Sequence, residues 1–228
     1  MVILNLKEDF RSFTRGKFLE RPNRFTVLVE AEGSVKKAHI SDTGRLKELL
    51  VPGADVLLSP NPRGKLDYKF VAVEKDGEWV LLNTSVHSKI ARRVIEIGLL
   101  GFKPENIQSE YRFGSSRIDF LVNGNMLVEV KGCNLAKNDT CLFPDAPTER
   151  GKRHLEELIA AVEKGYRAAV LFLAFRRCSG FLPNMEMDPA FSSTFYKALR
   201  AGVEFYGVRL GFLPTGEVTF RGKLHMKE

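Results

Sequence analysis

The sequence predicts an α/β chain, α+β overall, with a small β-barrel in residues 1–84 and an α/β domain with a mixed central sheet in residues 85–228. Three observations predict this fold. Short apolar stretches separated by turn residues fill the first part, as in a small barrel. Apolar residues at helical spacing first recur after residue 84. From there strands and helices alternate, which is typical of an α/β sheet.

Six apolar stretches are the candidate strands of the first part. They cover residues 10–19, 25–31, 35–40, 54–59, 70–73 and 79–83. Turn residues separate them, at Arg21-Pro-Asn23, Glu32-Gly-Ser34, Pro52-Gly53, residues 60–64 and Asp76-Gly77. Five or six short strands suit a closed barrel of the OB type, and one short helix fits near residues 44–50.

A helix near residues 86–98 opens the second part, because Val86, Ile90, Val94 and Ile97 recur at helical spacing. The other expected elements follow in chain order: strands near 107–113, 116–122 and 126–132, a helix from Asp145 to about Lys164, a strand at 167–174, a helix near 189–200, and strands near 203–212 and 217–221. Strands and helices in this order predict a mixed sheet.

The bulk composition favours some classes of protein over others. The 228 residues carry a formal net charge of +7, which favours polyanionic partners. The longest apolar run, residues 168–175, is too short to span a bilayer, and the N-terminus meets charge too early for a signal peptide. Cys133, Cys141 and Cys178 show no CxxC spacing. This odd count predicts a reducing, cytoplasmic setting and argues against a disulfide framework or a zinc site.

The segment of residues 117–131 reads as a hairpin with a polar turn at 123–125. Side chains alternate along a strand, so Glu129 and Lys131 share one face. A two-residue loop would put Asp119 and Glu129 on opposite faces, whereas a loop of about three residues pairs them. A single site that contains Asp119, Glu129 and Lys131 therefore requires the three-residue loop.

Two carboxylates and a lysine on one edge of a sheet can hold a divalent metal and activate a water, which is an arrangement for cutting a phosphodiester. The same strand pattern also fits a solvated face with an ion pair. From these residues alone the solvated face is the better interpretation.

Longer strings carry a resemblance to a known family. Gly114-Ser-Ser-Arg-Ile-Asp-Phe-Leu121, Val128-Glu-Val-Lys-Gly132 and Leu142-Phe-Pro-Asp-Ala-Pro-Thr-Glu-Arg-Gly151 resemble the sugar fermentation stimulation protein (SfsA) family. The string around residues 143–151 is specific, and the likeness covers nearly the whole chain. One departure is visible at His39-Ile-Ser-Asp-Thr-Gly44, where the family often has His-Cys-Pro-Asn-Thr-Gly.

The resemblance implies a DNA-binding protein with an N-terminal OB-like domain. It implies a C-terminal domain similar to the PD-(D/E)xK superfamily, which is a restriction-endonuclease-like α/β fold. The superfamily pattern maps onto Asp119, Glu129 and Lys131, with Glu96 on the preceding helix as an additional acid. For Glu96 a surface ion pair with Arg92 or Arg93 serves equally well.

In this interpretation Asp119 and Glu129 bind Mg²⁺ or Mn²⁺, and the backbone carbonyl of Val130 adds a ligand. Hard oxygen ligands without cysteine or a histidine pair exclude zinc. Lys131 would orient the attacking water or stabilise developing negative charge. His154 is expected to be a packed or capping histidine and not a general base.

Basic residues in both parts are candidate DNA contacts. Arg117 is expected opposite Lys131, and the helix after Asp145 carries Arg150 and Lys152. In the barrel the candidates are Arg15, Lys17 and Arg45. Phenylalanines alternate with basic residues there, but at alternate strand positions Phe is more often part of the core.

Two functions remain open. The first is a metal-dependent DNA nuclease, and the alternative is a non-catalytic DNA-binding or regulatory protein that retains the acidic cluster. The residues do not distinguish single- from double-stranded DNA. A homodimer is expected if the protein cuts duplex DNA, because two strands need two sites.

Overall fold

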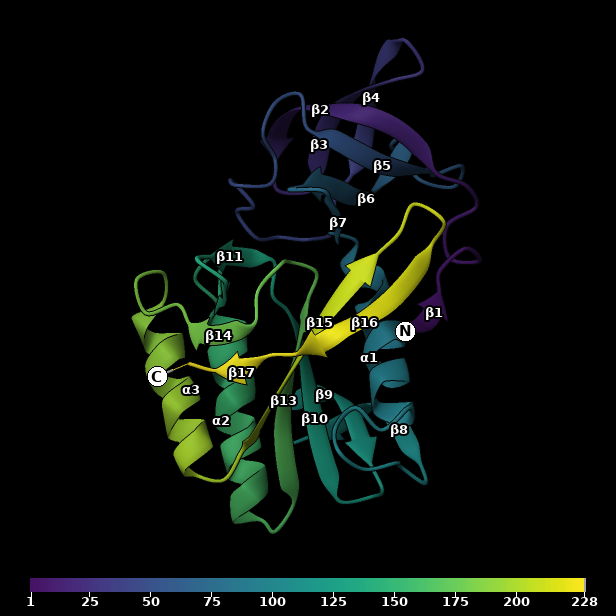
Figure 1. Cartoon of the computed structure of the whole chain (residues 1–228). Coiled ribbons are helices and arrows are strands. Elements are labelled where there is room, and N and C mark those ends of the chain that lie inside the picture. Colours follow the sequence, from purple (N-terminus) through teal and green to yellow (C-terminus); the bar gives the residue numbers. More distant parts are fainter. Residues whose placement is uncertain (228) are drawn as a thin grey trace. The chain divides into compact units, whose positions relative to one another are not determined.

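The computed structural model describes residues 1–227, which divide into two compact units (Figure 1). Unit 1 contains Met1–His87 and Leu210–Arg221, and unit 2 contains Ser88–Arg209 and the chain from Gly222 on. The strand β15 (Glu204–Phe212) is divided between the units, with its residues up to Arg209 in unit 2 and those from Leu210 on in unit 1. The division into domains of residues 1–84 and 85–228 stays a prediction.

Unit 1 is built around a closed five-stranded barrel. Its elements are β1 (Val2–Asn5), β2 (Thr14–Asn23), β3 (Thr26–Ala31), β4 (Ser34–His39), β5 (Asp55–Pro60), β6 (Tyr68–Lys75), β7 (Glu78–Leu81), the 3-10 turn Thr84–Val86 and most of β16 (Glu217–Lys223). The order β4-β3-β2-β5-β6 closes through a parallel pairing of β4 with β6. Inward residues such as Val27, Val29 and Phe70 are fully buried, as the alternating pattern predicts.

The first predicted turn is wrong, because Arg21-Pro-Asn23 lies within β2 and the chain turns at residues 24–25. The helix expected near residues 44–50 is also wrong. That segment is a loop with one turn, and Leu46 has a φ of 52°. A left-handed residue at this point is incompatible with a right-handed helix. Leu46 and Leu49 are buried, so these two apolar side chains anchor the loop to the core.

Unit 2 has a mixed sheet of β8 (Ile107–Phe113), β9 (Ser116–Val122), β10 (Met126–Gly132), β13 (Arg167–Ala174) and β15. β8, β9 and β10 are antiparallel neighbours, whereas β10–β13 and β13–β15 are parallel. This is the mixed α/β sheet that the sequence predicts. β10 is an internal strand, which decides the environment of its acidic residue.

Three helices accompany this sheet: α1 (His87–Glu96), α2 (Glu149–Glu163) and α3 (Pro189–Arg200). α2 packs on β9, β10 and β13, and α3 lies beside α2 (Figure 1). The carboxylate of Asp188 accepts hydrogen bonds at the start of α2 and at the start of α3. Its Oδ1 accepts the N–H of Phe191 at 2.9 Å and its Oδ2 accepts the N–H of Thr148 at 2.8 Å.

The second helix begins four residues later than expected, because Thr148 is its N-cap and accepts the N–H of Gly151 at 3.0 Å. Asp145 and Pro147 lie in the loop before it. Between these helices and the sheet, a cluster of phenylalanine rings fills the core, with Phe172 and Phe181 4.2 Å apart at their centroids. This packing fixes α2 over β10.

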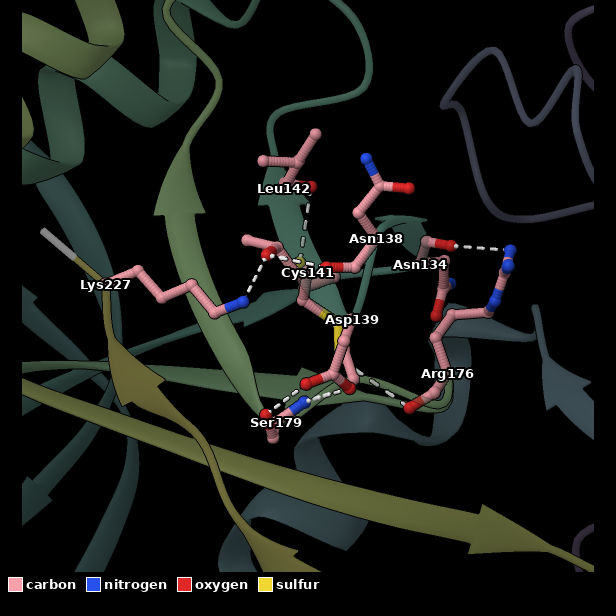
Figure 2. The surroundings of a disulfide bond; sticks show 11 residues. Asn134, Asn138, Asp139, Cys141, Leu142, Arg176, Ser179 and Lys227 are labelled. Carbon is pink, nitrogen blue, oxygen red and sulfur yellow. Dashed lines mark hydrogen bonds between the residues drawn. A yellow bond between two sulfur atoms is a disulfide. The ribbon is translucent and has the colours of Figure 1, made fainter.

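A small second sheet in unit 2 was not expected. It consists of β11 (Leu135–Lys137), β12 (Thr140–Phe143), β14 (Gly180–Pro183) and β17 (His225–Met226). Beside it, Cys141 and Cys178 form a disulfide, with their Cα atoms 5.7 Å apart (Figure 2). Asp139 accepts hydrogen bonds from the Ser179 backbone and hydroxyl next to this bridge.

The disulfide contradicts the argument that the cysteine count speaks against disulfide bonding. Spacing rules report pairs that are close in sequence, whereas these two cysteines are 37 residues apart and meet through the pairing of β12 with β14. The cysteine argument for a reducing, cytoplasmic setting therefore loses its basis. Cys133 is free and buried, and burial raises the pKa of its thiol.

Across residues 1–227, no helix combines the length and the apolar character needed to span a membrane.

Candidate functional site

The hairpin of β9 and β10 has the register that the site requires. Val122 pairs with Met126 and Phe120 pairs with Val128, which leaves the three residues 123–125 as the loop. Asn123 and Gly124 take positive φ values of 51° and 70°. The three-residue loop is thus confirmed, and continuing this register places Asp119 opposite Glu129.

The regular ladder between β9 and β10 extends no further than Phe120 and Val128. Beyond it, the Oδ2 of Asp119 accepts the backbone N–H of Val130 at 2.7 Å. A side-chain carboxylate thus bonds a main-chain donor of the neighbouring strand, which orients Asp119 toward β10. The other oxygen of Asp119 is left for another partner.

The sequence suggested that Glu129 lies on an open sheet edge, but the structure places it inside the sheet. β10 is flanked by β9 and β13, α2 covers this face, and Glu129 is only 3% exposed. Its Oε1 contacts the Nζ of Lys131 and the Nδ1 of His154. A solvated surface ion pair is therefore excluded for Glu129.

The sequence missed His154 as a member of this cluster. His154 is 3% exposed on α2, and its Nδ1 lies 3.2 Å from the Nζ of Lys131. The Nε of Arg150 donates to its Nε2 at 3.4 Å, which favours the tautomer with the proton on Nδ1, directed to Glu129. The available signal was position, since His154 falls within the buried stripe of α2 where a polar group needs a partner.

The two acids have opposite pKa shifts. Burial, followed by the charge of Glu129, raises the pKa of Asp119 to about 6. Burial alone would raise the pKa of Glu129, but Lys131 and His154 outweigh it and lower this pKa. Neighbouring carboxylates with separated pKa values are a feature of functional sites.

The cluster has one unsatisfied acceptor. The Oε2 of Glu129 is buried, and residues 1–227 supply no hydrogen-bond partner for it. A buried carboxylate oxygen without a donor is costly, and a bound cation would relieve that cost. The carboxylates of Asp119 and Glu129 supply hard oxygen ligands, which is the chemistry that Mg²⁺ and Mn²⁺ prefer.

Within residues 1–227, however, no three His, Cys, Asp or Glu side chains are grouped to hold a metal ion. The protein supplies two carboxylates at this point, and Glu96 does not join them. Its carboxylate instead pairs with Arg92 at 2.9 Å and Arg93 at 3.6 Å on α1. This is the ion-pair alternative that the helical spacing left open.

The remaining predicted contacts in unit 2 lie on its surface. Arg117 pairs with Glu110 of β8 at 3.4 Å, and its neighbour across the ladder is Arg112. Lys152 pairs with Glu156 one helical turn later, at 3.6 Å. Arg150 alone among these residues contacts the site, through His154.

The predicted contacts in unit 1 are exposed on the barrel. Arg15 lies over the ring of Trp79, 5.9 Å from its centroid. Lys17 pairs with Asp55 at 2.8 Å, and Arg45 is exposed on the loop after β4. Phe18 belongs to the core, as expected for an alternate strand position. Phe10 is also buried, but it lies before β2, which begins at Thr14 and not at residue 10.

The fold defines a class of protein with an N-terminal OB barrel and a C-terminal α/β domain. Residues 19–82 match the family described as "SfsA N-terminal OB domain", and residues 85–216 match "Sugar fermentation stimulation protein RE domain". The chain belongs to the sugar fermentation stimulation protein family.

Relatives extend over most of the chain. A sugar fermentation stimulation protein homolog of Methanothermobacter thermautotrophicus is 50% identical over 199 residues, which cover 83% of this chain and 82% of the relative. One of Pyrobaculum islandicum is 44% identical over 208 residues, with 88% and 89% covered. The solved structure of Pyrococcus furiosus SfsA in complex with Ca²⁺ is similar over 100% of both chains, with a TM-score of 0.90 at 31% identity.

Proposed function

We propose that this protein binds DNA and that Asp119, Glu129 and Lys131 form a metal-dependent phosphodiesterase site of the PD-(D/E)xK kind. The observation that carries the proposal is the buried, unpartnered Oε2 of Glu129 beside a second carboxylate whose pKa is raised. A bound cation would satisfy this acceptor, and a metal site would therefore explain why the protein itself gives it no donor.

Divalent-cation binding in a relative supports the metal. SfsA of Pyrococcus furiosus is described in complex with Ca²⁺, and Ca²⁺ shares with Mg²⁺ and Mn²⁺ a preference for oxygen ligands. Here Asp119 and Glu129 would hold Mg²⁺ or Mn²⁺, with the carbonyl of Val130 as a further ligand. A bound ion would supply charge neutralisation at the phosphate and make a coordinated water more acidic.

The chain's own residues then have distinct roles. His154 orients Glu129 through Nδ1, and Arg150 holds the other ring nitrogen. Lys131 balances the charge of Glu129 and presents an ammonium group that can stabilise negative charge on a phosphate. The N–H of Val130 fixes one oxygen of Asp119, so both acids are preorganised.

DNA contacts are proposed for basic residues that are exposed or, in the case of Lys152, half-buried, in keeping with the net charge of +7. They are Arg117, Arg150 and Lys152 of unit 2, and Arg15, Lys17 and Arg45 of unit 1. Cleavage of both strands of a duplex would need two such sites, which a homodimer would supply. Light scattering of the protein with and without duplex DNA tests this stoichiometry.

The second candidate is a DNA-binding or regulatory protein without turnover. It is favoured by the pairing of Glu96 with two arginines, which keeps this acid out of the cluster. In this case metal or DNA binding survives while the phosphodiester stays intact.

Incubation with labelled single- and double-stranded DNA in Mg²⁺, Mn²⁺ or EDTA separates the two candidates. The nuclease proposal expects metal-dependent product that Asp119→Asn and Lys131→Ala reduce by at least about a hundredfold. Asp76→Asn, which neutralises an exposed carboxylate in a hairpin turn, is the matched control and should retain activity. If the protein binds DNA but leaves both single- and double-stranded substrates uncut under all conditions, the second candidate is established instead.

A further inference from the structure

Phe25 occupies an unusual position on the barrel. It lies in the two-residue turn between β2 and β3, where Asn23 pairs with Thr26 and where Asn, Asp or Gly is usually found. Its side chain is 50% exposed, whereas Phe10 and Phe18 are 1% and 3% exposed. Core packing therefore does not account for this aromatic ring.

Two planar side-chain groups lie near the Phe25 ring. The ring of His39 on β4 is nearly parallel to it, at an interplanar angle of 7° and a centroid distance of 6.5 Å. The guanidinium of Arg24 lies 5.9 Å from the Phe25 centroid. The backbone of Phe25 is fixed on both sides, because its N–H donates to the Oδ1 of Asn23 and its carbonyl accepts from Ile40, each at 3.0 Å.

One arginine connects this turn to the loop after β4. The guanidinium of Arg21 donates to the carbonyls of Arg24, Asp42 and Gly44, at 2.8, 2.8 and 2.6 Å. The loop is also held internally, since the N–H of Gly44 donates to the Oδ1 of Asp42 at 2.9 Å. Arg45, which is exposed, is thereby held in the loop joined to the Phe25 turn.

Basic residues lie on the elements that carry or adjoin the two rings. Lys37 precedes His39 by two residues on β4, so both side chains project from the same outer face. Lys69 of β6 is directly opposite His39 in the parallel pairing that closes the barrel. Arg24 and Arg45 complete the set. Flat aromatic rings flanked by cations are complementary to exposed bases and their phosphates.

We propose that Phe25 and His39 form a stacking platform for an unpaired base of single-stranded DNA, with Arg24 and Arg45 contacting the adjoining phosphates. This rests on the DNA binding proposed above and names the form of DNA that the barrel takes. A duplex covers the faces of its bases by stacking, whereas a single strand can present one to an exposed ring. In this proposal the loop of residues 39–45 positions His39 and Arg45 beside the Phe25 turn.

The test measures binding of the full chain in EDTA, where metal plays no part. The probes are a labelled thymidine oligomer of about twelve nucleotides, an abasic oligomer with the same sugar-phosphate backbone, a duplex and a uridine oligomer of equal length. Phe25→Ala should weaken thymidine binding about tenfold and leave abasic binding unchanged. Phe25→Tyr should restore the affinity, because it keeps an aromatic face.

Val35→Ala is the matched control, since it removes an exposed apolar side chain from β4 of the same barrel. It should leave all four affinities unchanged. Equal binding of thymidine and abasic oligomers by the wild type would overturn the platform while DNA binding stands. Absence of binding to every probe would overturn the DNA-binding proposal itself. Tighter binding of uridine would overturn the assignment to DNA, and tighter binding of duplex would overturn the single-strand preference.

Discussion

Asp119 destabilises the folded protein when no cation neutralises it. Burial and the charge of Glu129 raise its pKa from 3.8 to about 6. The unfolded chain therefore releases this proton at lower pH than the folded chain does. The stability contributed by protonated Asp119 is complete below about pH 4 and is lost as the pH rises through 6.

Asp119→Asn should remove this pH dependence, because the amide keeps an acceptor for the Val130 N–H but carries no charge. In EDTA at pH 7 we expect the variant to be more stable than the wild type by up to about 3 kcal/mol. Urea unfolding from pH 4 to 7 measures the difference. Saturating Mn²⁺ should stabilise the wild type and not the variant. A constant difference across this pH range would contradict the expected burial of the carboxylate.

His154 contributes to the site through Glu129. His154→Leu should leave the Glu129 carboxylate with Lys131 as its remaining side-chain partner and lower the stability by about 1–3 kcal/mol. It should also weaken divalent-metal binding about tenfold or more, because ligand orientation is lost. His154→Asn can place an amide N–H near the position of Nδ1 and should recover part of both. Calorimetric titration with Mn²⁺ distinguishes this role from simple core packing, which would alter stability alone.

At the scale of elements, the disulfide fixes β12 against the chain that leads into β14. The bridge closes a loop of 37 residues, so its loss should lower the stability by about 4 kcal/mol through the entropy of the unfolded chain. Thermal unfolding with and without reductant measures this effect. Cys141→Ala with Cys178→Ala should abolish the response to reductant, whereas Cys133→Ala, at the free thiol, should preserve it.

The elements that the sequence predicted best have local signals. α3 begins after Asp188 and at Pro189, which together define a helix start, and it covers the expected residues 189–200. Alternation and a polar turn predicted the hairpin of β9 and β10 but left its loop length open, and the three-residue loop was expected only if the two acids share one site. Elements that depend on partners distant in sequence were missed. β12 and β14 are four residues each and pair with one another across the disulfide loop.

The same distinction applies to the candidate site. Asp119, Glu129 and Lys131 lie within one hairpin, so spacing with a three-residue loop could bring them together, and the family resemblance favoured a site over a solvated face. The contact of His154 depends on how α2 packs over β10, which spacing does not report. The ion pairs of Glu96 were foreseen as an alternative because Arg92 and Arg93 lie within one turn of the same helix.

At the scale of the whole molecule, the net charge of +7 predicts DNA binding that weakens with salt. The slope counts the phosphates neutralised, about 0.7 per contact for a single strand. Arg45 is exposed on its loop, so Arg45→Ala should reduce the slope by about one contact. Lys17 is already paired with Asp55, so Lys17→Ala should change it less. Fluorescence anisotropy with a thymidine oligomer at several salt concentrations measures both. A slope that neither variant alters would place the phosphate contacts elsewhere on the chain.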